Sequence, residues 1–374
     1  MIWNYFSPSH TVFGEKSIEQ TVEKFKMLKA SKPLFVLSQR MVELESIQRI
    51  FDSFEKNKIS YNVTTKVKSE SPINLVQDIY DEFRMNNCDS IIAIGGGSAI
   101  DLSKAVAILT TNEGNIEDYL GLHNVPKPTV PKIFIPTTAG TGSEATNISV
   151  LSNKNSNSKI GIVSHHLFAD IAILDPTLTY SMPRELVLST GMDAFCQCVE
   201  GYTSKNISPI LEIMALKGIE LISTNIENSL DGQKDARKNM LLGSYLSGIV
   251  IAGGNAGTNI GHAIGNTIGG MFGSPHGITV TAVLEQSMKF NATDSVFSNQ
   301  IKKIKHLTNI DIFEFINSIK NVEGLPSLNN IGVRHEHVGE IAEKVIKDQQ
   351  RLLSNNQKSV TKEDIITILS SSIK

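Results

Sequence analysis

The spacing of the apolar residues changes once along the chain, and this change limits the folds that the chain can adopt. Up to about residue 178, short apolar runs alternate with segments of helical spacing, and runs without polar alternation are typical of buried parallel strands. After Asp175-Pro176 the apolar residues recur with a helical period. The sequence therefore predicts the α/β plus all-α class, with a parallel-sheet domain over residues 1–179 and a helical domain over residues 180–374.

Individual segments can be assigned from the same pattern. Helices are expected at Leu44–Lys56 and Ile73–Met85, and a further helix can start after Pro183. Two strand-like pieces within Ala145–Ser164 flank a run rich in Asn and Ser, which predicts a hairpin outside the main sheet. The polar stretch Gln349–Thr361 is expected to pack loosely. The strands of the main sheet are expected at Leu34–Ser38, Tyr61–Val67, Ser90–Ile94, Ile133–Pro136 and Ile171–Leu174.

Length and charge exclude several classes of protein. A chain of 374 residues exceeds one ordinary core, which favours two domains. A net charge of -3 implies no basic face for nucleic acid, and no apolar run approaches the ~18 residues of a membrane span. The amino terminus has no signal-peptide pattern, so we expect a cytoplasmic protein. The three cysteines, Cys88, Cys196 and Cys198, are too few and too irregularly spaced for a disulfide framework or a thiolate zinc site.

A glycine run follows the predicted strand Ser90–Ile94. The residues between this strand and a predicted helix are Gly95, Gly96, Gly97 and Ser98. In such a place backbone N–H groups and the positive end of the helix dipole can bind a diphosphate. The run is neither GxGxxG nor GxxxxGK[ST], and tight turns also use glycine for purely steric reasons. Its place between strand and helix favours a nucleotide site.

A second loop of small residues follows the next strand, in PTTAGTGSE. Thr137, Thr138 and Thr141 offer hydroxyl groups to phosphate or ribose, although the same residues would also suit a plain turn. Because loops at the carboxyl ends of neighbouring parallel strands meet at one sheet edge, the two loops together predict a Rossmann-like, dinucleotide-binding domain.

The segment NIGHAIGNTIGGMFGSPHG is built for close approach of backbone or ligand. His262 and His276 stand fourteen residues apart in it, with glycine in much of the gap. On an earlier predicted helix Asp193 and Gln197 are four residues apart and share a face. A carboxylate with two imidazoles suits a divalent metal such as zinc or iron. The alternatives are hydrogen-bonded core histidines and a solvated carboxylate at the start of a helix.

These pieces together resemble the iron-containing (group III) alcohol dehydrogenase family of the dehydroquinate-synthase-like superfamily. The pieces that match occur in the family's order and extend to about residue 280: the FG at residues 13–14, GGGSAID, PTTAGTGSEAT, DPTL, GMDAFCQCVEGY and the histidine segment ending in SPHG. The resemblance implies that the first domain binds NAD or NADP and that the helical domain binds one metal ion. It also implies hydride transfer between nicotinamide and a small alcohol, aldehyde or ketone in an interdomain cleft.

Residue roles carry over position by position. Asp193, His262 and His276 match three of the family's four metal ligands, but Gln197 stands where the family has histidine. Asn266 stands where many members have another histidine near the substrate. We expect His262, His276, Gln197 and Asn266 to serve catalysis. The cofactor is expected to contact Ser38, Gly95, Gly96, Gly97, Ser98, Asp101, Thr137, Thr138, Thr141, Lys159 and Leu178.

The departure at Gln197 leaves three outcomes open. Glutamine is a poor ligand for iron or zinc, so the first outcome is a weakened metal site completed by Gln197 or water. The second is a metal-independent reductase, similar to maleylacetate reductase, in which Gln197, Asn266 and one histidine hydrogen-bond to the substrate oxyanion. In that case His262 or His276 is the imidazole able to act as general acid. The third is a non-catalytic nucleotide-binding relative, and a sugar-phosphate cyclase is disfavoured because the histidine segment lacks basic residues.

Two further predictions concern the cofactor and the assembly. NAD-selective folds place an acid after the second strand, whereas this chain has Ser38-Gln39-Arg40, which favours NADP because Arg40 can pair with a phosphate. The extended segment Ile2–Val12 is expected to pair as an edge strand with a second copy, giving a homodimer as the family suggests.

Overall fold

The computed structural model describes residues 2–153, 158–320 and 327–373. The chain divides into two compact units. One consists of Ser7–Thr138 with Gly142–Ser181, and the other contains the residues from Met182 onward together with Ala139–Thr141 and the residues up to Phe6. The predicted domain limit between residues 179 and 180 stays a prediction, because two compact units do not by themselves establish two independently folding domains.

A parallel sheet of six strands forms the centre of the first unit, with the spatial order β1-β9-β6-β4-β2-β3. The five predicted strands are confirmed, although β3 is shorter than predicted. The strand β1 was not predicted as part of this sheet. The strands are β1 His10–Phe13, β2 Pro33–Leu37, β3 Asn62–Thr64, β4 Ser90–Gly95, β6 Lys132–Pro136 and β9 Ile171–Leu174.

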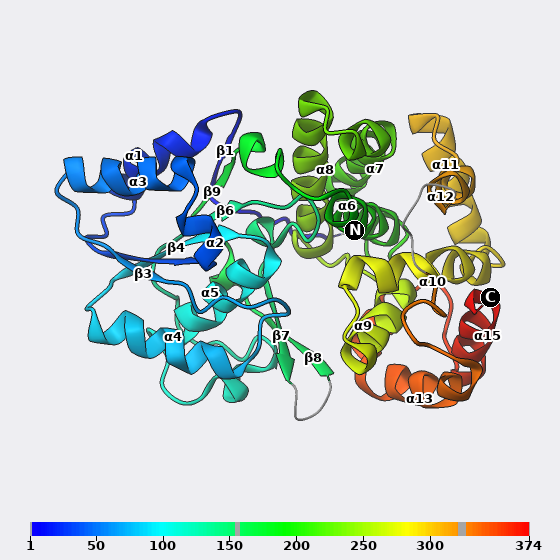
Figure 1. Ribbon diagram of the computed structural model, residues 1–374. Helices are drawn as coiled ribbons and strands as arrows, with labels where there is room; N and C mark the ends of the chain where they lie inside the picture. The colour runs from blue at the N-terminus through cyan, green and yellow to red at the C-terminus, as the bar shows by residue number, and fades with distance from the viewer. Residues whose placement is uncertain (1, 154–157, 321–326, 374) are drawn as a thin grey trace. The chain divides into compact units, whose positions relative to one another are not determined.

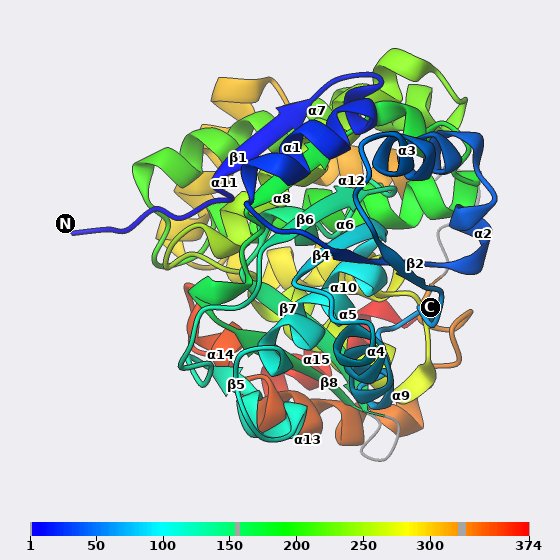
Figure 2. The same cartoon turned by 90° about the vertical axis from the view of Figure 1, so that its left-hand side faces the viewer.

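Helices cover both faces of this sheet, which explains why its strands are apolar on both sides (Figure 2). Phe35 and Ile92 pack on the side of helices α1 and α3, whereas Leu34 and Ile91 pack on the side of α4 and α5. All four side chains are almost fully buried. The helices of this unit are α1 Thr21–Met27, α2 Gln39–Val42, α3 Glu45–Lys56, α4 Asn74–Met85 and α5 Gly97–Leu109, with short 3-10 turns at Ser17–Gln20, Ile116–Tyr119, Ser143–Ala145, His165–Leu167 and Pro176–Thr179.

The predicted hairpin is confirmed as an antiparallel pair of strands, β7 Ile148–Asn153 and β8 Ser158–Val163, outside the main sheet (Figure 1). Its predicted turn lies at residues 154–157, outside the described residues. A third, two-residue strand, β5 Gly121–Leu122, pairs with β8 in parallel. This short strand was not predicted, since two residues carry no periodicity.

The described secondary structure of the second unit from Met182 onward consists of helices joined by loops, as predicted (Figure 1). None of the described helices is long and apolar enough to cross a membrane. The three cysteines are buried free thiols. The helices are α6 Arg184–Tyr202, α7 Pro209–Leu230, α8 Lys234–Ala252, α9 Ile260–Phe272, α10 His276–Asn291, α11 Ser295–Thr308, α12 Ile312–Lys320, α13 Val338–Asp348, α14 Gln350–Ser354 and α15 Lys362–Ser372, with a 3-10 turn at His335–His337.

One expectation about the chain ends needs correction, and another stays a prediction. Residues 10–13 pair with β9 of the same chain and form the end strand of the sheet, so the pairing of Ile2–Val12 with a second copy stays a prediction. The stretch Gln349–Thr361 is not loosely packed: Leu352 is buried, and the amide of Asn356 exchanges two hydrogen bonds with the amide of Asn291. A polar amide can be buried there because its partner satisfies it.

Candidate functional site

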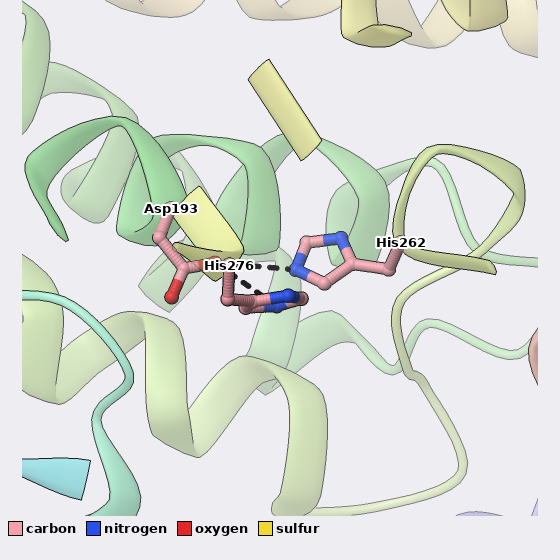
Figure 3. Close-up of side chains that lie close together, drawn as sticks. All are labelled: Asp193, His262 and His276. Atoms are coloured by element: carbon pink, nitrogen blue, oxygen red, sulfur yellow. Dashed lines mark ion pairs between the residues drawn. The ribbon is translucent and has the colours of Figure 1, made fainter. Parts of the chain in front are cut away.

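Three side chains that are far apart in the sequence meet in the helical unit: Asp193, His262 and His276 (Figure 3). The Nε2 atoms of both histidines lie 3.5 Å from Asp193 Oδ1, and the two imidazole centroids are 5.3 Å apart. One ligand atom from each residue lies within 4.8 Å of the other two. The predicted convergence of these three residues is therefore observed.

The glycine-rich segment brings the two histidines together by forming two helices with a tight turn between them. His262 is in the first turn of α9, and His276 is the first residue of α10. Gly273 ends α9 with φ 65°, a left-handed conformation that favours glycine. A Cβ atom at Gly265 would lie 2.6 Å from Val280 Cγ2, so glycine lets α9 approach α10 closely. A Cβ atom at Gly277 would collide with the carbonyl of Ser189 on α6.

A carboxylate that sequence reasoning missed lies behind His262. Glu200, which is 3 % exposed, accepts a hydrogen bond from His262 Nδ1 at 2.6 Å. Its carboxylate oxygens also accept the backbone N–H groups of Asn259 at 2.9 Å and Gly261 at 2.6 Å, at the start of α9. Because the Glu200 carboxylate accepts this bond, Nδ1 carries its proton, and Nε2 of His262 faces Asp193, where it can bind a metal ion after losing its own proton.

A signal for Glu200 was present in the sequence. Asp193, Gln197 and Glu200 follow one another at four and three residues, so all three lie on one face of α6. A buried face with two acids and an amide is unusual unless the side chains have specific partners. The partner of Glu200 is about sixty residues further along the chain, at the start of α9.

The electrostatics of this cluster favour a cation. Burial alone would lower the pKa of His262, but the carboxylates of Glu200 and Asp193 outweigh it and raise the pKa of His262 to about 9. Two buried carboxylates therefore draw positive charge into the site, as a proton or as a metal ion. His262 Nε2 is buried and makes no hydrogen bond within the described residues. The residues present thus fit a divalent metal ion.

The two predicted nucleotide loops lie side by side at the carboxyl ends of β4 and β6. The N–H of Thr137 donates to the carbonyl of Gly95 at 3.0 Å. A Cβ atom at Gly96 would lie 3.1 Å from Thr138 Oγ1, so only glycine allows this approach without displacement. Helix α5 begins at Gly97, which directs its N-terminal N–H groups and dipole to this edge of the sheet.

The comparisons with known proteins agree with this arrangement. Residues 8–176 match the model of the iron-containing alcohol dehydrogenases, and residues 187–373 match that of the Fe-containing alcohol dehydrogenase family, C-terminal. The chain belongs to the iron-containing alcohol dehydrogenase family. It is accordingly an oxidoreductase of a family that acts on alcohols and aldehydes.

Relatives in this iron-containing alcohol dehydrogenase family match over nearly the whole chain. A sulfoacetaldehyde reductase of Bilophila wadsworthia is 29% identical, with 99% of this chain and 98% of the relative covered. A 1,3-propanediol dehydrogenase of Citrobacter freundii is 30% identical, with 97% of each chain covered. The structure of a 1,3-propanediol oxidoreductase is similar with a TM-score of 0.94 at 26% identity, covering 100% of both chains.

The two positions at which this chain departs from the family's histidines, Gln197 and Asn266, have different surroundings. Gln197 is buried, and its Oε1 lies 2.8 Å from the Oγ of Ser247 on α8, which donates to it. The Ser247 hydroxyl also lies 2.7 Å from the carbonyl of Ser244. Asn266 is partly buried and makes no side-chain hydrogen bond within the described residues. Their catalytic roles stay predictions.

The remaining predicted cofactor residues have diverse surroundings. Ser38 precedes α2 at the carboxyl end of β2, and Leu178 is buried beside the sheet. The carboxylate of Asp101 accepts a hydrogen bond from Ser143. Lys159 forms an ion pair with Glu70 at 2.5 Å, and the backbone N–H of Glu70 donates to Ser98 Oγ. Lys159 is therefore connected through Glu70 to the glycine turn, whereas the assignment of each of these residues to the cofactor stays a prediction.

Proposed function

We propose that this protein is an NAD(P)-dependent oxidoreductase that interconverts a small alcohol and its aldehyde or ketone with the help of a bound iron or zinc ion. The observation that carries the proposal is the meeting of Asp193, His262 and His276 around a buried imidazole nitrogen that has no hydrogen bond of its own within the described residues. The two loops at the carboxyl ends of β4 and β6 support nucleotide binding in the same chain.

In this proposal Asp193, His262 and His276 hold the metal ion. When bound, the metal supplies Lewis-acid chemistry at the substrate oxygen. Asp193 offsets part of the metal charge, and Glu200 fixes the His262 ring so that Nε2 points toward Asp193. The His276 side chain is 24% exposed against 5% for His262, so His276 is the histidine nearer to solvent.

We propose further that the metal site is weaker than in relatives with a fourth protein ligand. An amide oxygen is a poorer ligand for iron or zinc than imidazole. The Ser247 contact also occupies one side of the Gln197 amide. Three protein ligands leave coordination positions for water or substrate, which is typical of catalytic rather than structural metal sites.

The relatives suggest which substrates to test. One is named for sulfoacetaldehyde and another for 1,3-propanediol, so the substrate class proposed here is a short aldehyde, with or without a second polar group. A solved relative, a sulfoacetaldehyde reductase from Bifidobacterium kashiwanohense, is described in complex with NAD+. For this chain we propose NADP, because exposed Arg40 and the absence of an acid at Ser38-Gln39-Arg40 favour a 2′-phosphate.

Metal analysis combined with a substrate panel tests the proposal. Protein purified without chelator is analysed for iron and zinc, and NADPH and NADH oxidation is followed with 3-hydroxypropanal, sulfoacetaldehyde and unsubstituted short aldehydes. The measurement is repeated after chelation and after metal is added back. Turnover that is lost and then restored supports the proposal. Full turnover of the metal-free protein would instead establish a metal-independent reductase, and failure to bind either nucleotide would overturn the proposed function.

We also propose a homodimer. The strand β1 lies at one end of the sheet, and within the described residues no strand pairs with its outer edge. Phe13 of β1 is exposed, so a second copy that pairs with this strand would cover both backbone groups and apolar surface. Light scattering of the purified protein tests this, and a monomeric mass at micromolar concentration would contradict it.

A further inference from the structure

We propose that Lys104 is a positioning residue for the nicotinamide nucleotide, because its buried ammonium group fixes the second nucleotide loop to the helix that starts at the glycine turn. This inference rests on the proposed function. Lysine in a helix is normally solvated, yet Lys104 is 0% exposed. A buried ammonium group needs a complete set of acceptors, so its partners identify what it holds in place.

The ammonium group of Lys104 is surrounded by oxygen atoms from one short segment. Its Nζ lies 2.6 Å from the carbonyl of Ser143 and 3.1 Å from the Ser143 hydroxyl. It also lies 2.9 Å from Thr146 Oγ1 and 2.7 Å from the carbonyl of Ile148. All of these acceptors lie within residues 143–148, at the end of the loop PTTAGTGSE and just after it, so Lys104 fixes the point at which that loop ends.

The helix α5 carries this lysine on the face that begins at the glycine turn. Gly97, Asp101 and Lys104 are separated by four and three residues, so they share one helical face. Asp101 accepts a hydrogen bond from the Ser143 hydroxyl at 2.5 Å, and its carbonyl accepts one from Ser149. Ser143 is therefore held by two residues of the helix whose first turn is expected to bind the diphosphate.

The beginning of the same loop is attached to the glycine turn itself. Thr137 donates its N–H to Gly95, and Thr138 packs against Gly96. With Lys104 and Asp101 at the other end, both ends of the loop are connected to one strand-turn-helix element. Two loops fixed in this way present their N–H and hydroxyl groups with a smaller loss of conformational entropy when the nucleotide binds.

The charges around Lys104 show what would be lost with its ammonium group. Burial lowers the pKa of Lys104 to about 8, although the nearby carboxylates of Asp101 and Glu144 oppose this effect. Burial raises the pKa of Glu144 to about 7. The substitution Lys104→Met would remove the ammonium donor from the Ser143 and Ile148 carbonyls and the cation that opposes the charges of Asp101 and Glu144.

A second buried lysine of the same unit provides a matched control. Lys132 is 4% exposed and forms an ion pair with Asp170 at 3.4 Å. It is the first residue of β6, at the opposite end of the strand from the nucleotide loop. The substitution Lys132→Met removes a buried ammonium group without changing the attachment of that loop.

The test compares nucleotide binding with stability in the full-length protein. NADPH and NADH are titrated by fluorescence into the wild type and into Lys104→Met, Thr146→Val and Lys132→Met, and each melting temperature is measured. We expect Lys104→Met to raise the Kd for the nucleotide about tenfold and Thr146→Val to raise it about threefold. At saturating nucleotide, the KM for the aldehyde should change far less. Lys132→Met should lower the melting temperature with little change in Kd.

The possible outcomes are distinguishable. If Lys104→Met binds the nucleotide with the Kd of the wild type, or with a Kd raised no more than that of Lys132→Met, Lys104 has only a structural role. This result would overturn the inference. If Lys104→Met does not fold, Thr146→Val decides, because it removes a single acceptor from the Lys104 ammonium group and keeps the side-chain volume. A wild type that binds neither nucleotide would overturn the proposed function itself.

Discussion

Glu200 accepts a hydrogen bond from Nδ1 of His262 at 2.6 Å, and this pair connects the last turns of α6 with the first turn of α9. The same carboxylate receives N–H groups from the start of α9, where the helix dipole also favours negative charge. Glu200 therefore determines both where α9 begins and which nitrogen atom His262 presents to Asp193.

The first prediction concerns Glu200→Gln. We expect the affinity for zinc or iron to fall about ten- to a hundredfold, because the ring loses the carboxylate that raises its basicity and fixes its tautomer. Competition with a chromogenic chelator measures the affinity. Glu185→Gln, at an exposed position of the same helix, is the matched control. An unchanged metal affinity in Glu200→Gln would show that Glu200 only caps α9.

Gln197→His tests whether the metal site is weakened by the lost imidazole. A histidine at this position adds a nitrogen ligand one helical turn after Asp193, and we expect metal to bind about tenfold more tightly. The exposed Gln77→His supplies a control for a new histidine elsewhere in the chain. If Gln197→His binds metal no better than the wild type, the geometry at Gln197 does not allow a fourth protein ligand.

The core of the fold could be predicted from the sequence because its strands are buried on both faces. The run at Ser90–Gly95 is fully buried, so its apolar residues have no polar interruptions. The strand β1 was missed because His10–Phe13 is only partly buried, and its partner β9 lies about 160 residues further along the chain. Pairing of this kind depends on the tertiary fold and leaves no local pattern.

The candidate site could be predicted only in part. Asp193, His262 and His276 were found because two histidines bracket a glycine-rich segment and because all three positions match metal ligands of the family that the sequence resembles. Glu200 and Lys104 were missed because charged residues in a helix are normally solvated, and only the distant partners of these two side chains explain their burial. The partners follow Glu200 by about sixty residues and Lys104 by about forty.

His276→Ala tests the roles proposed for the more exposed histidine of the cluster. We expect kcat/KM for the aldehyde to fall about a hundredfold or more, together with metal content, because one of three ligands is lost. Metal analysis and steady-state kinetics measure the two effects. The exposed His306→Ala should change neither. Turnover at the wild-type level in His276→Ala would exclude both a ligand role and a general-acid role for His276.

Asp89 provides a pH-dependent prediction in the first unit, away from any predicted ligand. Its carboxylate accepts the N–H and hydroxyl of Ser31 at 2.7 and 2.6 Å, and the N–H of Lys32 at 2.9 Å. Burial alone would raise the pKa of Asp89, but these hydrogen bonds and one from Ser90 outweigh it and lower the pKa below the ordinary value of 3.8. The ionised form is therefore favoured in the folded protein.

A group with a lowered folded pKa stabilises the protein above its unfolded pKa, and that contribution is lost as the pH falls through the folded value. We expect Asp89→Asn to reduce the free energy of unfolding by about 1 kcal/mol at pH 7, since the carboxylate is only partly buried. The difference from the wild type should shrink as the pH falls below 3.8, the ordinary value for Asp89. Urea unfolding at several pH values measures it, with the exposed Asp52→Asn as control. Only the ionised form of Asp89 makes charge-assisted hydrogen bonds. If the difference in unfolding free energy stays constant down to pH values at which Asp89 is protonated, the Asp89 charge does not contribute to stability.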